Sequence, residues 1–246
     1  MSRVAVIIPA AGSSTRFGGE VKKPFVVLDG KPVWHRAVDL FARRPDVVMV
    51  YLVLSADALA EFRARYGVML GFTYENVELV AGGAERFESV ANALALVPEA
   101  IDLVAVHDAV RCLTPTGVID AVFAAATEHG GAVAAVPVAD TLKRVAPGTT
   151  RVVETVPRGD LWQAQTPQAF RRDWLADAFA RRAEFAGPIT DDAQLLEAAG
   201  YPVVVVPGSP TNFKITAPAD LALAEALLRP VPPAEPKPRH PFDDAD

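Results

Sequence analysis

Cysteine is almost absent from this sequence, in which Cys112 is the single one among 246 residues. One cysteine cannot build an internal disulfide framework, so a disulfide-stabilised secreted scaffold is excluded and a reducing cytoplasm is the expected location. We interpret Cys112 as a small core residue rather than as a nucleophile.

Long apolar runs and a basic surplus are also missing. No run approaches the roughly 18 residues that a membrane helix needs, and the short apolar run after Arg3 lacks the length and flanks of a signal peptide. The net charge is −6 and the pI about 5.3, whereas nucleic-acid-binding proteins usually have a basic face. We therefore expect neither a membrane nor a nucleic acid as partner, and a local basic cluster in an acidic chain suggests a small anionic substrate.

What the chain does contain is a regular alternation of short valine-rich runs with segments of helical period. Strands rich in valine on both faces, each followed by a helix, predict an α/β fold with a mostly parallel sheet and helices on both faces. Thr114 is the expected N-cap of a helix with Pro115 at its first position. The expected strands are 4–9, 47–54, 77–80, 101–107 and 131–138, and the expected helices are 33–44, 58–66, 86–97 and 117–129.

The alternation breaks after Val138, where two short runs around "APGTT" predict a β-hairpin. We expect the domain to span 1–228 with this arm at about 139–160. The tail, 229–246, has six prolines in eighteen residues and is predicted to be disordered. Further expected elements are a helix at about 172–185, a helix capped by Thr190 and ended by Gly200, a strand at 202–207 and a helix at 218–228 that Pro218 begins.

The first strand leads into "PAAGSSTRFGGEVKKPF" (9–25), a loop of small residues followed by basic ones. The spacing of its glycines matches neither a Walker A loop nor a dinucleotide fingerprint. Small residues nevertheless let backbone N–H groups converge on phosphate oxygens, and Arg and Lys neutralise phosphate charge. The loop therefore predicts an anion site, with a plain solvated turn as the alternative.

Seven segments in a fixed order extend this prediction: the opening loop, "GGAERFESV", "HDAVR", "DTLK", "RGDLWQAQTPQAF", "ITDDAQLLE" and "NFKIT". Together they resemble the 2-C-methyl-D-erythritol 4-phosphate cytidylyltransferases of the non-mevalonate isoprenoid pathway, a family with a Rossmann-like nucleotide-diphospho-sugar transferase fold. The resemblance covers about 3–228. It implies that CTP and methylerythritol 4-phosphate are the substrates, that Mg²⁺ is the cofactor, and that alignment and charge neutralisation drive the reaction without a protein nucleophile.

The resemblance also implies roles for individual residues. Asp108 would hold Mg²⁺, which agrees with its position after a strand, at the sheet edge where ligands bind in parallel sheets. His107 is expected to pack or hydrogen-bond rather than to act as a base. The family's pattern is altered by Pro24 after the assigned lysine and by Pro157 before Arg158. The implied catalytic residues are Arg16, Lys23 and Lys214. The implied nucleotide-binding residues are Ala10, Ala11, Gly12, Gly82, Gly83 and Ser89, and the implied substrate-binding residues are Arg111, Thr141, Arg158, Thr166 and Thr190.

A two-stranded hairpin is marginal alone in water, and the family's arm clasps that of a second subunit, so a homodimer is expected. Two other functions stay open. Ribitol 5-phosphate cytidylyltransferase shares the nucleotide, the metal and much of the loop chemistry. A non-catalytic nucleotide-binding regulatory module is the alternative from another class, although it would not need Asp108, Lys23 and Lys214 together.

Overall fold

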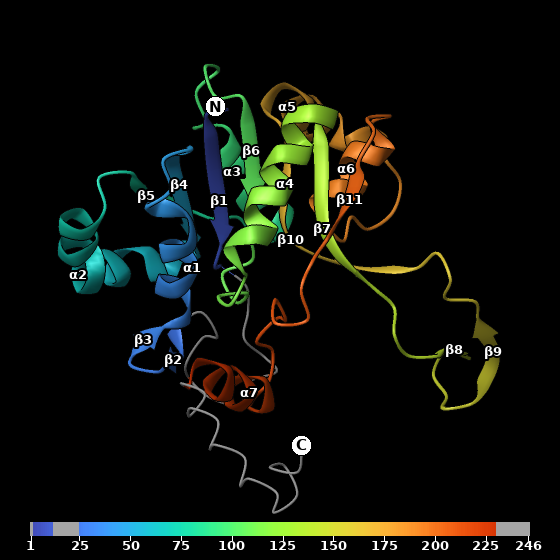
Figure 1. Cartoon of the computed structure of the whole chain (residues 1–246). Coiled ribbons are helices and arrows are strands. Elements are labelled where there is room, and N and C mark those ends of the chain that lie inside the picture. Colours follow the sequence, from blue (N-terminus) through green and yellow to red (C-terminus); the bar gives the residue numbers. More distant parts are fainter. Residues whose placement is uncertain (1, 12–24, 230–246) are drawn as a thin grey trace, which may run out of the picture.

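The computed structural model of this chain describes residues 2–11 and 25–229, and within them it forms a seven-stranded sheet with helices on both faces (Figure 1). The strand order is β11-β7-β10-β6-β1-β4-β5, so the α/β prediction is confirmed. The sheet contains β1 (Val4–Pro9), β4 (Val47–Leu54), β5 (Val77–Ala81), β6 (Leu103–Val106), β7 (Gly131–Pro137), β10 (Trp162–Arg171) and β11 (Val204–Pro207). Two small hairpins pair β2 (Val27–Leu28) with β3 (Lys31–Pro32), and β8 (Leu142–Val145) with β9 (Val152–Val156).

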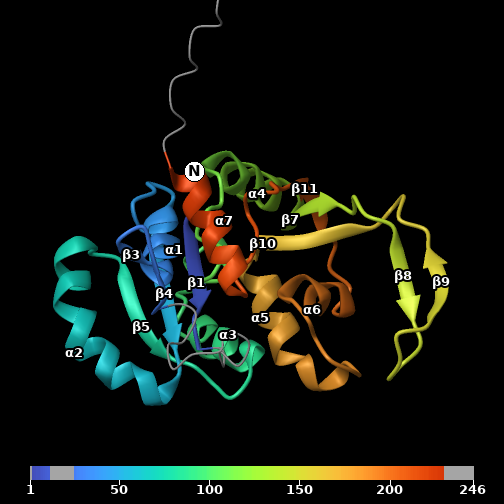
Figure 2. The ribbon, with the colours of Figure 1, turned by 90° about the horizontal axis from the view of Figure 1, so that it is seen from below.

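The helices divide between the two faces of the sheet (Figure 2). One face packs against α1 and α4, and the other against α3, α5 and α6. The helices are α1 (Val33–Ala42), α2 (Ala56–Thr73), α3 (Arg86–Leu94), α4 (Thr116–His129), α5 (Arg172–Ala180), α6 (Asp192–Ala198) and α7 (Pro218–Leu228), with a short 3-10 helix at Arg182–Glu184. No helix in the described ranges is long and apolar enough to cross a membrane.

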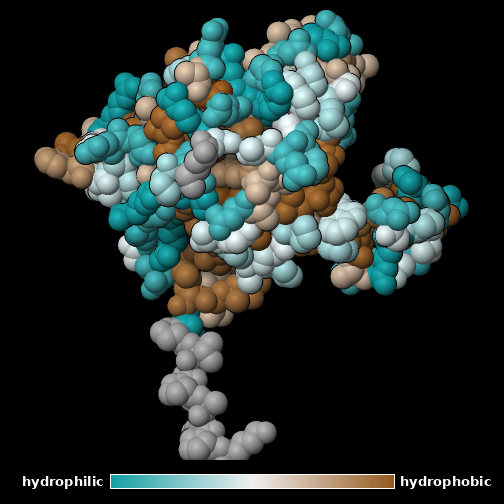
Figure 3. Space-filling view, turned by 45° about the horizontal axis from the view of Figure 1, so that its top comes forward, coloured by the Kyte–Doolittle hydropathy of each residue, from teal (hydrophilic) through white to brown (hydrophobic). Residues whose placement is uncertain are grey.

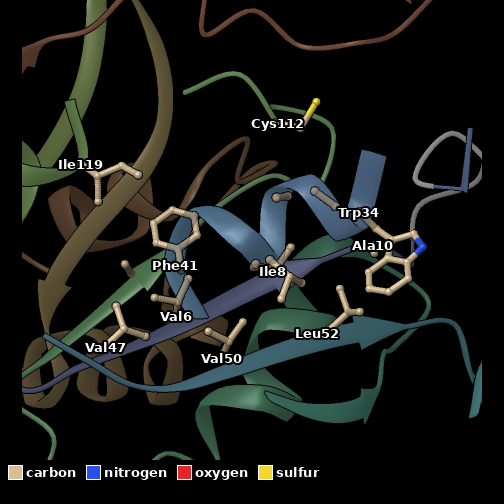
Figure 4. Close-up of a cluster of buried hydrophobic side chains, with 14 of the residues drawn as sticks. Val6, Ile8, Ala10, Trp34, Phe41, Val47, Val50, Leu52, Cys112 and Ile119 are labelled. Atoms are coloured by element: carbon tan, nitrogen blue, oxygen red, sulfur yellow. The ribbon is translucent and has the colours of Figure 1, made fainter. Parts of the chain in front are cut away.

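Strand β1 shows how the sequence creates the two cores. Successive strand side chains point to opposite faces. Val4, Val6 and Ile8 are therefore buried in the cluster under α1 and α4, and Ala5 and Ile7 in the cluster under α3, α5 and α6. Figure 4 shows the first cluster between β1, β4 and α1. A strand buried on both faces needs apolar residues at every position, which explains why the run is continuous.

Strand β10 departs from the parallel pattern, because it runs antiparallel to both of its neighbours, β6 and β7. No strand is predicted from the sequence at 162–171. After β7 the chain leaves the sheet to form the arm, and it then returns beside the carboxyl end of β7. There Val138 N–H donates to the Leu161 carbonyl at 3.0 Å. A strand that starts where its neighbour ends must run in the opposite direction.

The arm stands away from the body of the molecule as a separate lobe (Figure 3). Its strands β8 and β9 pair antiparallel, which confirms the expected hairpin. The apolar side chains of Val145, Val152 and Val153 are 43 to 53% exposed, so within one chain the hairpin has little apolar cover.

Several element boundaries differ from the predictions. Helix α2 continues to Thr73, and α5 ends at Ala180. The N-cap of α4 is Pro115, and the hydroxyl of Thr114 faces the Asn212 amide oxygen at 2.7 Å instead of capping. The N-cap of α6 is Asp191 rather than Thr190, and its carboxylate accepts the Gln194 N–H.

Candidate active site

A cavity of about 250 Å³ lies at the carboxyl end of β6. Three parts of the chain contribute to its walls: the residues that follow β6, the bulged middle of β10, and the segment that follows β11. The register of β10 against β7 is irregular between Ala164 and Gln168, and bulges of this kind re-aim side chains next to active sites. The lining residues are Arg86, Asp108, Arg111, Ala164, Gln165, Thr166, Gln168, Thr190, Asp191 and Lys214.

Asp108 is the centre of this cavity's charge. Its Oδ2 lies 3.1 Å from Lys214 Nζ and 3.4 Å from Arg111 Nε, and its Oδ1 lies 3.6 Å from Arg86 Nε. Burial by itself would raise the pKa of the Asp108 carboxyl, but the charges of Lys214, Arg86 and Arg111 outweigh burial and hold that pKa well below its usual range. Asp108 is therefore ionised at neutral pH.

His107 and Thr166 fix the backbone that carries Asp108. The Thr166 hydroxyl accepts the Asp108 N–H at 3.0 Å and lies 3.2 Å from His107 Nδ1. His107 Nε2 lies 3.0 Å from the Arg111 carbonyl. A carbonyl can only accept, so Nε2 carries the proton and Nδ1 accepts from Thr166. Burial lowers the pKa of His107 to about 4, which agrees with the prediction of a packing role.

Asn212, whose side chain is fully buried, ties three walls of the cavity together. Its amide nitrogen donates to the Thr166 carbonyl at 2.8 Å and to Gln165 Oε1 at 3.1 Å. The backbone carbonyl of Asn212 accepts a hydrogen bond from Arg111 Nη1 at 2.7 Å. Asn212 thus positions Arg111 and, two residues later in the chain, Lys214.

The predicted nucleotide-side residues that the structure describes also come together. Gly82 N–H donates to the Leu54 carbonyl at 2.7 Å. A Cβ on Gly82 would lie 2.6 Å from Ser89 Oγ and 3.0 Å from the Ala11 Cβ, so only glycine allows this close approach. Gly83 N–H donates to Ser89 Oγ at 3.2 Å. The loop between β5 and α3 is therefore packed directly against the end of β1.

The predicted site residues fall into four groups. Thr141 and Arg158 are exposed on the arm and do not line the cavity within one chain. Gly12, Arg16 and Lys23 lie outside the described residues. Ala11, Gly82, Gly83 and Ser89 lie together beside the end of β1, where the side chain of Ala10 is buried in the core. Asp108, Arg111, Thr166, Thr190 and Lys214 line the cavity.

Sequence reasoning missed Arg86, Asp192 and Asn212. Each lies inside a segment that was quoted for the resemblance, so the signal was present, but nothing local distinguishes them from surface polar residues. Arg86 Nη2 lies 2.8 Å from Asp192 Oδ2. Burial by itself would lower the pKa of the Arg86 guanidinium, but the carboxylates of Asp192 and Asp108 raise it.

Comparisons with known proteins point to a single family. The sequence model of the 2-C-methyl-D-erythritol 4-phosphate cytidylyltransferase family (IspD) matches residues 4–230. A protein of that name from Frankia casuarinae is 46% identical over 234 residues, which are 95% of this chain and 84% of the relative. A bifunctional enzyme IspD/IspF from Desulfotalea psychrophila is 43% identical over 230 residues, which are 93% of this chain, and this chain spans 58% of its length.

Among solved structures, that of 2-C-methyl-D-erythritol 4-phosphate cytidylyltransferase from Thermus thermophilus is similar with a TM-score of 0.73 and 36% identity, covering 90% of this chain and 96% of that one. The 4-diphosphocytidyl-2C-methyl-D-erythritol synthase from Anaerococcus prevotii has a TM-score of 0.79 at 26% identity, covering 92% of this chain and 96% of that one. The similarity therefore includes both the sheet and the segments that form the cavity.

Proposed function

Since this chain belongs to the 2-C-methyl-D-erythritol 4-phosphate cytidylyltransferase family, we infer that the cavity around Asp108 carries out that family's reaction. The enzyme transfers CMP from CTP to 2-C-methyl-D-erythritol 4-phosphate, forming 4-diphosphocytidyl-2-C-methyl-D-erythritol and pyrophosphate, in non-mevalonate isoprenoid precursor biosynthesis. The observation that carries this proposal is the convergence of Arg86, Arg111 and Lys214 on Asp108 at the carboxyl edge of the sheet.

Positioned charge suits this reaction. A phosphate oxygen of the polyol phosphate attacks the α-phosphorus of CTP, the new P–O bond forms, and pyrophosphate leaves with the electron pair of the broken bond. The protein's task is to align the two anions and to neutralise their charge. We propose that Lys214 and Arg111 contact the substrate phosphate from the cavity, and that Arg16 and Lys23 contact the triphosphate.

The nucleotide is proposed to bind beside the loop between β5 and α3. A side chain at Gly82 has no room there, because its Cβ would lie 2.6 Å from Ser89 Oγ and 3.0 Å from the Ala11 Cβ. Selection of a pyrimidine by tight backbone hydrogen bonds requires such small residues. Gly83 and Ala10 are assigned to the same side, and Gly12 is assigned there from the family pattern alone.

Mg²⁺ is the proposed cofactor. Asp108 would hold the ion together with phosphate oxygens of CTP, because Mg²⁺ is usually bound by one or two carboxylates plus substrate phosphates. Within 2–11 and 25–229, no group of three or more acidic, His or Cys side chains could hold a metal by itself. When bound, the ion would neutralise charge on the reacting phosphates.

The polyol is proposed to contact Thr166 and Thr190 in the cavity. Thr141 and Arg158 flank the β8–β9 hairpin within the exposed arm, so we propose that they reach the substrate pocket of a second subunit in a homodimer. The single cysteine, which is buried, supports the proposed location in the cytoplasm.

Pyrophosphate release, measured with each NTP against both polyol phosphates, tests the function. We expect release with CTP and methylerythritol 4-phosphate. Faster release with ribitol 5-phosphate would favour the rival enzyme. Nucleotide binding without any release would favour a regulatory module.

A matched pair of lysine variants connects the activity to the cavity. Lys214→Ala should lower kcat/KM by about 10²-fold, the typical cost of removing one preorganised charge donor. Lys31→Ala is the control, because Lys31 is similarly exposed (40% against 46%) and also contacts an aspartate, Asp39, away from the cavity. Equal effects of the two substitutions would contradict the placement of the active site.

A further inference from the structure

Arg86 occupies a position between the two halves of the site. It is the first residue of α3 and directly follows the nucleotide-side loop of Gly82 and Gly83. Its guanidinium nevertheless lines the cavity on the polyol side. There it contacts two carboxylates, with Nη2 at 2.8 Å from Asp192 Oδ2 and Nε at 3.6 Å from Asp108 Oδ1.

Asp192 gives this arginine a rigid anchor. It is the first residue of α6 and its side chain is 2% exposed. The adjacent Asp191 caps α6 through Gln194 N–H and accepts from Gln168 Nε2 at 2.8 Å, which ties α6 to β10. The ion pair of Arg86 and Asp192 therefore joins the start of α3 to the start of α6.

The two oxygens of Asp108 are shared unequally among the cations. Arg111 and Lys214 lie next to Oδ2, and Arg86 lies next to Oδ1. Arg111 and Lys214 are the side chains proposed to contact the substrate phosphate, so a bound phosphate would compete with Asp108 for them. Arg86 is held separately by Asp192, so such a phosphate would leave its contact with Oδ1 in place.

We propose that Arg86, held by Asp192, is a positioning residue that orients Asp108 and keeps the nucleotide side and the polyol side of the site in register. This inference rests on the proposed function. Arg86 acts through Asp108 and does not itself touch the reacting phosphates. Because a shift of about 1 Å in the reacting groups can cost about 10²-fold in rate, a link between the two halves affects turnover directly.

Steady-state kinetics of pyrophosphate release from CTP and methylerythritol 4-phosphate test the proposal. Arg86→Lys keeps the charge but removes the planar fork that reaches two carboxylates, and Asp192→Asn removes the anchor's charge. We expect each variant to lower kcat by about 10 to 100-fold, with KM for both substrates changed less. The double variant should be no slower than the slower single variant, because residues that act as one unit are not additive.

Arg44 provides the matched control. It also bridges two carboxylates, at 2.7 Å to Asp46 and 2.8 Å to Asp120, but away from the cavity. Arg44→Lys should lower the thermal midpoint without changing kcat. Guanidinium ion at a non-denaturing concentration should restore activity to Arg86→Ala in a saturable manner, and should not change the activity of Arg44→Ala.

Three results would overturn the proposal. A large kcat loss for Arg86→Lys with near-normal turnover for Asp192→Asn would make Arg86 a direct substrate contact. Losses that multiply in the double variant would make the two residues independent. If guanidinium does not restore the activity of folded Arg86→Ala, the loss of kcat comes from a general structural change rather than from the missing guanidinium group. This experiment decides between the two if Asp192→Asn does not fold. An inactive wild-type enzyme would contradict the proposed function instead.

Discussion

At the scale of single residues, the described cations of the cavity already face carboxylates of the protein itself. Arg86, Arg111 and Lys214 all face Asp108, and Asp191 lines the same cavity. An incoming phosphate therefore competes with Asp108 for Arg111 and Lys214. A divalent ion on Asp108 would remove that competition, because the carboxylate would then have a counterion of its own.

This reasoning predicts the behaviour of Asp108→Asn. The variant keeps the shape of the side chain but loses the charge that would hold Mg²⁺. The Mg²⁺ concentration at half-maximal activity should therefore rise by at least about 10-fold. A Mg²⁺ titration of pyrophosphate release measures the change. Asp39→Asn is the control, because Asp39 also contacts two cations, Lys31 and Arg43, away from the cavity. An unchanged titration for Asp108→Asn would make Asp108 a structural residue.

At the scale of elements, the junction of α4 and β7 depends on a single glycine. Gly130 ends α4 with φ at +88°, a conformation that L side chains rarely adopt. A Cβ at this position would also lie 2.3 Å from the ring of Trp174 on α5. Gly130 therefore lets α5 pack closely under the sheet while the chain turns back into β7.

Two alanine variants separate these two effects. Gly200 also has φ at +88°, but a Cβ added there would have no atom within 4 Å, so Gly200→Ala should lower the free energy of unfolding by about 1 to 2 kcal/mol through backbone strain alone. Gly130→Ala should cost a further 1 to 3 kcal/mol, roughly, because Trp174 must move. Urea unfolding of both variants measures the difference, and equal losses would show that Trp174 moves without cost.

Within a single chain, the arm leaves apolar side chains exposed. Two-stranded hairpins are marginal alone, and its valines are exposed. The brown area near the bottom of Figure 3, where α7 lies in Figure 1, is a second exposed apolar region, with Leu223 53% and Leu227 47% exposed. Of the two, only the arm is flanked by residues that the family pattern assigns to the substrate.

At the scale of the whole molecule, the proposed homodimer predicts complementation between inactive subunits. Lys23→Ala removes a charge from the body, and Arg158→Ala removes one from the arm. If the arm acts in the neighbouring subunit, a mixed dimer has one site with both defects and one site with neither. Mixing the two inactive variants should therefore recover up to about half of wild-type activity per mixed dimer.

The measurement is pyrophosphate release after subunit exchange, with exchange confirmed by differently tagged chains. Each variant alone, carried through the same exchange, is the control for residual activity. If exchanged dimers stay inactive, Arg158 works in its own subunit and the arm serves as a lid on its own domain.

Local sequence pattern determined most of the sheet and its helices. The continuous apolar run of β1 required burial on two faces, and Pro218 marked the start of α7. The hairpin followed from its turn residues, and the order of the seven quoted segments indicated the family. These signals are local, because periodicity, caps and turn chemistry act over a few neighbouring residues.

Tertiary structure decided what depends on residues far apart in the chain. Strand β10 is antiparallel because the arm brings the chain back beside the end of β7, where it left the sheet. No pattern within 162–171 encodes this direction. Arg86 and Asp192, which form an ion pair, are 106 positions apart. Thr114, which was predicted to be a helix cap, instead donates a hydrogen bond to Asn212, 98 positions away. A charged or polar side chain in sequence has many possible partners, and the order of the strands selects one of them. The sequence therefore determined the elements and the family, whereas the fold determined which charges meet at Asp108.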